Sequence, residues 1–129
     1  MSSNSNKYIK VLISLGSNID EYNNISEAKK MLNKCFCNLR YSSFVWTKPI
    51  GISSGYFFNG LAYGDTSYNL ERTLEILKDI ESKCGSLKEE KRVGIVRIDL
   101  DLMKYGETIL HKEDWKRYYI QDLYKELNR

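Results

Sequence analysis

The amino-acid sequence predicts an α+β fold in which an antiparallel sheet is backed by helices. Segments with strand-like alternation of apolar residues are interspersed with segments of helical spacing, in the order β-α-β-β-α-β-α. An apolar fraction of 42% and a single proline indicate an ordered core. At 129 residues we expect one domain over residues 7–129, after a Ser/Asn-rich tail at residues 1–6.

The first half of the chain supplies three predicted strands and one helix. Residues 8–15 alternate between apolar and polar types, and the turn Gly16-Ser17-Asn18 follows. From Asn24 the apolar spacing becomes helical, with a predicted buried stripe of Ile25, Ala28, Met31, Leu32 and Cys35. Residues 39–47 predict a second strand, and residues 57–64 a third strand antiparallel to it.

The second half supplies two helices and a final strand. Asp65-Thr66-Ser67 offers capping oxygens for a helix that ends at Gly85, with a predicted stripe of Leu70, Leu74, Leu77, Ile80 and Cys84. Residues 93–105 predict the last strand, and Asp114 is predicted to cap a helix carrying Trp115, Tyr119, Leu123 and Leu127. This order is that of the ferredoxin-like βαββαβ fold with an added C-terminal helix. Many activities use this fold, so function must be inferred from particular residues.

The last predicted strand contains two acids within an apolar run, Arg97-Ile98-Asp99-Leu100-Asp101-Leu102. Strand alternation places Asp99 and Asp101 on one face. Two carboxylates this close raise each other's pKa unless a cation lies between them. Magnesium suits such a pair, because it takes one or two protein carboxylates and completes its shell with water and substrate phosphates. A strand with one solvated face is the alternative explanation.

Basic residues concentrate just before the two acids, although the net charge of +3 is too small to indicate a nucleic-acid partner. A solvated charged loop would explain them, but beside a predicted magnesium site they favour a polyphosphate ligand. The residues are Lys83, Lys88, Lys91, Arg92 and Arg97.

Several classes of protein are disfavoured by what the sequence lacks. The three cysteines have no CxxC spacing and His111 is the single histidine, so we do not expect a zinc site or a Cys–His nucleophile. Free thiols fit a reducing cytoplasm. We expect no membrane span and no signal peptide, because no long apolar run and no basic-then-apolar leader is present. Neither a Walker-type phosphate loop nor a Rossmann glycine pattern occurs.

An ordered set of segments, covering roughly residues 8–106, resembles the hydroxymethyl-dihydropterin pyrophosphokinase family of folate biosynthesis. The segments are Leu15-Gly16-Ser17-Asn18, residues 42–51, Phe57-Phe58-Asn59-Gly60, residues 80–85 and residues 97–102. Members of this family transfer a diphosphate from ATP to the hydroxymethyl group of a reduced pterin and release AMP. The resemblance implies the same substrates here.

The resemblance also implies roles for individual residues. Asp99 and Asp101 would bind two magnesium ions that bridge the ATP phosphates, with Arg92 and Arg97 as further catalytic cations. The implied pterin contacts are Thr47, Ile50, Gly51, Phe57, Asn59 and Tyr119. The implied ATP contacts are Glu81, Lys88, Arg92, Leu102 and Arg117.

Chemistry supports some of these roles and leaves alternatives for others. The Asn59 amide can donate to and accept from the mixed edge of a pterin, and Phe57, on the same strand face, can stack on its ring. Core packing is the alternative for Phe57 and Tyr119, and a solvated helix surface is the alternative for Glu81.

The chain departs from the family pattern at two places. The usual Trp-Gly-Pro-Arg before the metal-binding strand is replaced by Val93-Gly94-Ile95-Val96. Arg97 comes one residue later, where strand alternation predicts that it shares a face with the two acids and either neutralises them or reaches a phosphate. The family's Pro-His pair has no clear match, so His111 either substitutes for that histidine or is an exposed residue at the helix entry.

The sequence therefore predicts a cytoplasmic, monomeric enzyme that binds ATP, magnesium and a reduced pterin, without a nucleic-acid or membrane partner. One alternative is a catalytically weak or inactive homologue that retains a pterin or nucleotide pocket. Another is an unrelated ferredoxin-like interaction or RNA-binding module, against which the small net charge and the lack of an RNP-like motif argue.

Overall fold

A computed structural model describes residues 7–48 and 55–128. These residues form one six-stranded sheet, with strand order β2-β4-β1-β5-β6 and β3 paired to β4, and every pairing is antiparallel. The strands are β1 (Ile9–Ser17), β2 (Cys37–Tyr41), β3 (Val45–Thr47), β4 (Phe57–Thr66), β5 (Asp99–Tyr105) and β6 (Thr108–Ile109).

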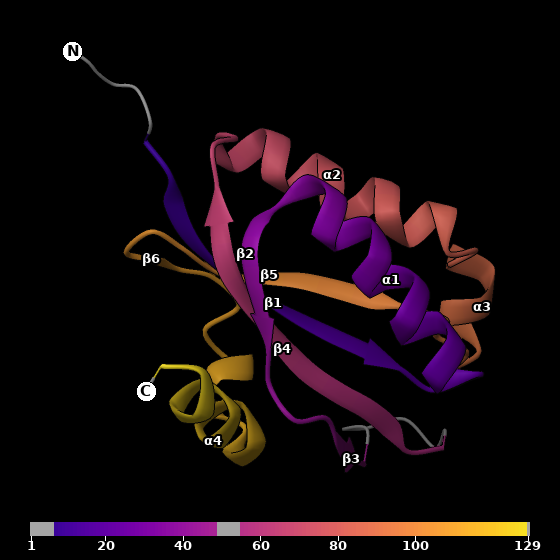
Figure 1. Ribbon diagram of the computed structural model, residues 1–129. Coiled ribbons are helices and arrows are strands. Elements are labelled where there is room, and N and C mark those ends of the chain that lie inside the picture. The colour runs from indigo at the N-terminus through magenta and orange to yellow at the C-terminus, as the bar shows by residue number, and fades with distance from the viewer. Residues whose placement is uncertain (1–6, 49–54, 129) are drawn as a thin grey trace.

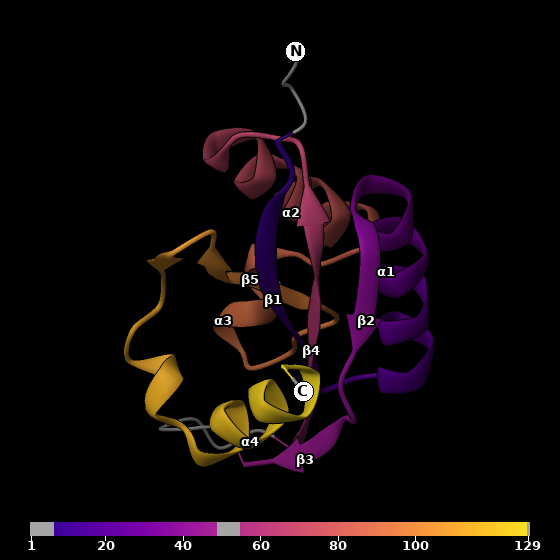
Figure 2. The same cartoon turned by 60° about the vertical axis from the view of Figure 1, so that its left-hand side comes forward.

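Helices cover both faces of the sheet (Figures 1 and 2). Helices α1 (Glu21–Cys35) and α2 (Leu70–Lys83) lie on one face, and α4 (Tyr118–Leu127) lies on the other. A short helix, α3 (Lys88–Arg92), precedes β5, and a 3-10 turn, η1 (Asp114–Lys116), precedes α4. The predicted α+β fold with a ferredoxin-like strand order is confirmed, and β6 and the C-terminal helix are additions to it.

Strand β1 is buried on both faces because it lies in the middle of the sheet. Val11, Ile13 and Leu15 join the core beneath α1 and α2, whereas Leu12 belongs to a second cluster beneath α4. The α1 stripe is largely as predicted, since Ile25, Ala28 and Leu32 are buried. Burial of both faces explains why this strand is so rich in apolar residues.

Helix α4 is attached to the sheet at both ends. Just before α4, in η1, the Trp115 indole N–H donates to the carbonyl oxygens of Met103 and Leu110, at 3.1 and 3.0 Å. Near its end, the Glu126 carboxylate accepts from the backbone N–H and the hydroxyl of Ser43, at 2.8 and 3.1 Å. Between these anchors, its apolar side packs on the sheet through Tyr119, Ile120, Leu123 and Leu127.

Three predictions for the first two thirds of the chain were wrong, and they concern a strand, a helix cap and a buried helix residue. The strand expected over residues 39–47 is broken into β2 and β3, because Ser42 hydrogen-bonds to the Leu61 backbone through both its N–H and its hydroxyl, at 2.9 Å each. Helix α2 is capped by Asn69, whose side chain accepts from the Arg72 N–H at 2.8 Å, and not by residues 65–67, since β4 runs to Thr66. Leu74 is exposed, and Thr73 is buried in the helix interface instead.

Two boundaries near the C-terminus also differ. The strand expected over residues 93–105 begins only at Asp99, because the Asn18 side chain binds the backbone at Gly94 and Val96 and keeps that segment in a loop. Asp114 begins the 3-10 turn η1, and α4 itself starts at Tyr118 without a side-chain cap.

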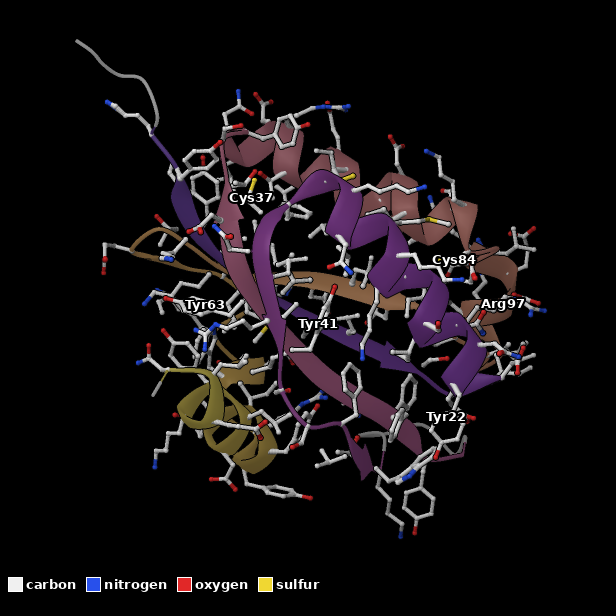
Figure 3. All side chains as sticks on the ribbon, in the orientation of Figure 1. Tyr22, Cys37, Tyr41, Tyr63, Cys84 and Arg97 are labelled. Carbon is white, nitrogen blue, oxygen red and sulfur yellow. The ribbon has the colours of Figure 1, made fainter. Side chains whose placement is uncertain are left out.

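Cys35, Cys37 and Cys84 are free thiols, and Cys37 and Cys84 lie far apart on the molecule (Figure 3). None of the helices in the described residues combines the length and apolar composition needed to cross a bilayer.

Gly64 of β4 faces an irregularity in β2, where the pairing register shifts and Asn38 has a φ of 57°. A Cβ atom on Gly64 would lie 2.7 Å from the Cys37 carbonyl oxygen and 3.1 Å from the Leu39 Cα. Both are backbone atoms, so neither can move away without disturbing the strand pairing. Glycine at such a place in a strand is typical of a β-bulge or a close backbone approach.

Gly64→Ala is therefore expected to lower the free energy of unfolding by about 2 kcal/mol, because it forces two strands apart. Urea denaturation followed by circular dichroism measures this change. Gly55→Ala is the matched control, since a Cβ atom there meets nothing within 4 Å. Equal stability of the two variants would contradict the packing argument.

Candidate active site

The candidate site is built on a row of residues across three neighbouring strands. Asp99 on β5 is paired with Gly16 on β1, and Gly16 is paired with Asn59 on β4. Adjacent strands are about 4.8 Å apart, so the backbones at Asp99 and Asn59 are about 10 Å apart. Gly16 has no side chain, so β1 places none between the acid and the amide, and the Asn59 amide lies over this glycine.

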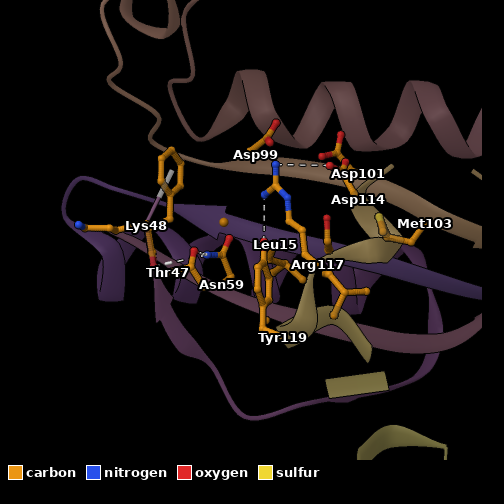
Figure 4. A pocket seen from close by; sticks show the side chains of 15 residues that line it. Leu15, Thr47, Lys48, Asn59, Asp99, Asp101, Met103, Asp114, Arg117 and Tyr119 are labelled. Carbon is orange, nitrogen blue, oxygen red and sulfur yellow. Dashed lines mark hydrogen bonds and ion pairs between the residues drawn. The ribbon is translucent and has the colours of Figure 1, made fainter. Parts of the chain in front are cut away.

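This row lines a cavity of about 220 Å³ between the sheet and the η1–α4 corner (Figure 4). The structure brings together in it many of the residues that the sequence predicted for the site: Thr47, Phe57, Asn59, Asp99, Asp101, Arg117 and Tyr119. Two predicted pterin contacts, Ile50 and Gly51, lie outside the described residues. The cavity thus has acids at one end and an amide with two aromatic rings nearby.

At the amide end, the orientation of Asn59 is fixed by its neighbours. Its Nδ2 donates to the Thr47 hydroxyl, and Thr47 is buried. A Cβ atom on Gly16 would lie 2.7 Å from the Asn59 Oδ1, so the amide can adopt this position only opposite a glycine. In the sequence, Gly16 was predicted as a turn residue and belonged to a segment that resembles the family. Its role appears once the register of β1 and β4 is known.

At the acid end, Asp99 and Asp101 lie on the same face of β5, as predicted. Burial, and then the negative charge of Asp99, raise the pKa of Asp101 to about 6, and His111 opposes this shift. The His111 Nε2 is 3.8 Å from an Asp101 oxygen, and its Nδ1 is 4.0 Å from an Asp114 oxygen. His111 is exposed and at the helix entry, yet it also approaches the acid pair.

The acid pair fits a magnesium ion shared with a phosphorylated ligand. The negative charge of Asp99 helps to raise the pKa of Asp101, so a divalent cation would stabilise the ionised form of both carboxylates. Across residues 7–48 and 55–128, no cluster of three or more Asp, Glu, His or Cys side chains could enclose a metal by itself. The two carboxylates of Asp99 and Asp101 agree with the preference of magnesium for few protein carboxylates and several water or phosphate oxygens.

Glu81 at the end of α2 connects that helix to the acid strand. One of its carboxylate oxygens accepts from the Leu100 N–H at 2.7 Å, and burial raises the pKa of Glu81. The Lys91 Nζ is 3.8 Å from the other oxygen and 3.6 Å from an Asp99 oxygen. Lys91, which the sequence analysis placed only among the basic residues of the loop, is thus a cation in contact with the acids.

The structure corrects the predicted position of Arg97. Because β5 begins at Asp99, strand alternation does not apply to Arg97, and its side chain does not line the cavity. Its guanidinium instead donates to both oxygens of Glu90 at 2.9 Å, at the α3 end of the molecule (Figure 3).

Four of the five predicted ATP contacts do not line the cavity, and one of these, Glu81, instead accepts from the Leu100 N–H. The Leu102 side chain is 1% exposed and packs in the core beneath α1 and α2, on the face opposite Asp99 and Asp101. Lys88 and Arg92 are exposed on α3 and lie outside the residues that line the described cavity.

Asn18 is a further residue whose role the sequence did not reveal. Its Nδ2 donates to the Gly94 carbonyl oxygen at 2.6 Å, and its Oδ1 accepts from the Val96 N–H at 2.7 Å. These bonds connect the end of β1 to the loop between α3 and β5. Asn18 therefore sets where the basic segment lies relative to the acids.

The fold and the cavity define an α+β protein whose cavity has an acid pair at one end and an amide–aromatic pocket at the other. The chain belongs to the 7,8-dihydro-6-hydroxymethylpterin-pyrophosphokinase family, whose model matches residues 12–129. It is also similar to the folate synthesis bifunctional protein of Arabidopsis thaliana, with 29% identity over 122 residues, which cover 86% of this chain. The matched region is 25% of that relative, so the chain spans about a quarter of its length. The family resemblance seen in the sequence is confirmed.

Asp101→Asn is expected to stabilise the metal-free protein above pH 6. The pKa of Asp101 in the folded state, about 6, exceeds the ordinary value of 3.8. The folded protein therefore binds this proton more tightly than the unfolded chain does, and that stabilisation is lost as the pH rises through this interval. The side chain is 33% exposed, and solvent screening reduces the expected gain at pH 7.5 to about 1 kcal/mol.

Thermal denaturation in EDTA at pH 4 and pH 7.5 measures this effect, which should disappear at the lower pH. Asp122→Asn, at an exposed position on α4, provides the same change of charge away from the cavity. An Asp101→Asn protein that is less stable than wild type at pH 7.5 would contradict the electrostatic argument.

Proposed function

We propose that this chain transfers a diphosphate from ATP to the hydroxymethyl group of 6-hydroxymethyl-7,8-dihydropterin, releasing AMP, as a step of folate synthesis. Its family membership and the name of its plant relative support this proposal. The structural observation that carries it is the row Asp99–Gly16–Asn59, which joins an acid pair and an amide pocket in one cavity. The spacing of about 10 Å suits a bicyclic ring beside a phosphate chain.

At the amide end, the protein offers the contacts that a flat, polar heterocycle requires. The rings of Phe57 and Tyr119 line the cavity, and the lack of a side chain at Gly16 leaves room for the Asn59 amide beside them. Asn59, oriented by Thr47, can donate to or accept from the ring edge. A ring bound there would direct its hydroxymethyl group toward Asp99 and Asp101.

At the acid end, Asp99 and Asp101 would bind magnesium together with the ATP phosphates. A magnesium ion held by these acids would supply positive charge to the phosphate oxygens and help to orient the triphosphate. The chain adds cations of its own, because Arg117 lines the cavity and Lys91 contacts Asp99. Fixed positive charge near the transferred phosphates stabilises the charge that develops on them, and no covalent nucleophile is required.

The runner-up proposal is a homologue that binds pterin or nucleotide but transfers diphosphate poorly. The position of Arg97 favours it, since this predicted catalytic cation is bound by Glu90 and does not line the cavity. Lys88 and Arg92 would have to approach the cavity by a movement of α3. The expectation of a cytoplasmic monomer stays a prediction.

Asp99→Ala and Asp101→Ala are each expected to lower AMP formation by about 100-fold or more, because each removes a ligand from the cation that positions the phosphates. The assay incubates the protein with ATP, magnesium and hydroxymethyl-dihydropterin and measures AMP by chromatography. Asp79→Ala, at an exposed position on α2, is the control for loss of an aspartate. Circular dichroism verifies that each variant folds.

The same experiment separates the candidate functions. A fully active Asp99→Ala/Asp101→Ala double variant would refute the role of the acids. Wild-type protein that binds a pterin and a non-hydrolysable ATP analogue in calorimetry, without forming AMP, would favour the inactive homologue. Failure to bind either ligand, together with RNA affinity, would favour the interaction module.

A further inference from the structure

Tyr119 contributes to the cavity in two ways. Its ring is 8% exposed and forms part of the wall, at the second residue of α4. Its hydroxyl oxygen accepts a hydrogen bond from the Arg117 Nη1 at 3.1 Å (Figure 4). From the sequence, only the ring was assigned a role, as a stacking partner for a pterin or as part of the core. The hydroxyl connects Tyr119 to an arginine in the same cavity.

The guanidinium of Arg117 has a second partner on its other side. The Arg117 Nη2 is 3.5 Å from an oxygen of Asp114, the first residue of η1. The local backbone fixes both partners, because the Arg117 N–H donates to the Asp114 carbonyl oxygen and the Ile120 N–H donates to that of Arg117, each at 3.1 Å. Asp114, Arg117 and Tyr119 thus form a rigid corner in which the arginine is bound from two sides.

The negative charges in the cavity explain why Arg117 needs to be held by this corner. Burial disfavours the charged form of Arg117, but the hydrogen bond to Tyr119 and the negative charges of Asp114 and Asp101 outweigh it and raise the pKa of Arg117. A flexible arginine beside Asp99 and Asp101 would be drawn onto those acids, since unlike charges attract strongly in a partly buried cavity. An arginine paired with the acids would occupy the place of a divalent cation.

We propose that the Tyr119 hydroxyl is a positioning group for Arg117. Together with Asp114, it directs the guanidinium into the cavity and keeps it away from Asp99 and Asp101, so that the arginine contacts the ligand phosphates and the acids stay open to a cation. This inference rests on the proposed function, in which Arg117 contacts the triphosphate. In this arrangement the ring of Tyr119 would contact the heterocycle, whereas its hydroxyl affects nucleotide binding through Arg117.

A purely structural role is the alternative, since a buried tyrosine hydroxyl needs a hydrogen-bond partner in any protein. The two roles differ in which substrate they affect. A structural role changes stability or both substrates alike, whereas the positioning role changes the nucleotide step alone.

Tyr119→Phe tests the proposal, because it removes the hydroxyl and keeps the ring. We expect the dissociation constant of a non-hydrolysable ATP analogue with magnesium to rise about 10-fold, as a lost hydrogen bond to a charged group predicts. We expect the KM for the pterin and the melting temperature to stay at the wild-type values. Tyr118→Phe is the matched control, since it removes the same atom from a neighbouring residue that is 74% exposed.

Two further variants show whether the hydroxyl acts through Arg117. In an Arg117→Gln protein, adding Tyr119→Phe should cause no further loss of nucleotide affinity, because coupled residues are not additive. Asp114→Asn, which weakens the other partner of the guanidinium, should give the same selective loss for the nucleotide.

Several outcomes would overturn the inference. These are unchanged nucleotide affinity in Tyr119→Phe, a defect confined to the pterin, and additive effects of the Arg117 and Tyr119 substitutions. A wild-type protein that neither binds the ATP analogue nor forms AMP would refute the proposed function as well as the inference. An active wild type with an unaffected Tyr119→Phe variant would refute the inference alone.

Discussion

The strand register of β1 is the constraint on which the site depends. It places Gly16 between Asp99 and Asn59, and Ser14 beside Asp101. A slip of one residue would turn every side chain of β1 to the opposite face and place a side chain where Gly16 makes room for the Asn59 amide. Apolar residues on both faces of β1 oppose such a slip, because Leu12 and Ile13 are both fully buried in different clusters. Core packing and site geometry are therefore specified by the same strand.

Several cations on the acid side of the molecule are bound by acids outside the pair Asp99 and Asp101. Arg97 is bound by Glu90, Arg117 by Asp114, and Lys91 lies between Glu81 and Asp99. Asp101, by contrast, has its pKa raised by burial and by Asp99, and its ion-pair contact in the described structure is the distant His111. Lys91 thus offsets part of the negative charge of Asp99, whereas no lysine or arginine in the described residues forms an ion pair with Asp101, and the pair keeps its capacity for a divalent ion.

Periodicity predicted the sheet, the order of its elements and the shared face of Asp99 and Asp101, because these depend on local alternation and burial. Periodicity failed to predict the features that depend on contacts between residues far apart in the sequence. The start of β5 is set by Asn18, which lies far away in the sequence, and the position of Arg97 is set by Glu90. The need for glycine at position 16 comes from an amide on another strand. None of these contacts leaves a pattern in the local sequence, whereas the family resemblance identified most of the cavity.

The two walls of the cavity differ in how firmly they are held, and this difference bears on how a ligand would bind. The η1–α4 wall is fixed by an apolar cluster and by hydrogen bonds at both ends, so its geometry exists before binding and little entropy is lost in using it. Helix α3 has no buried residue, and its side chains meet the rest of the protein through ion pairs that are each worth about 1 kcal/mol or less. Elements with so few buried contacts open at low free-energy cost. A ligand phosphate could therefore compete for the cations of α3, whereas the cavity wall formed by η1 and α4 keeps its shape.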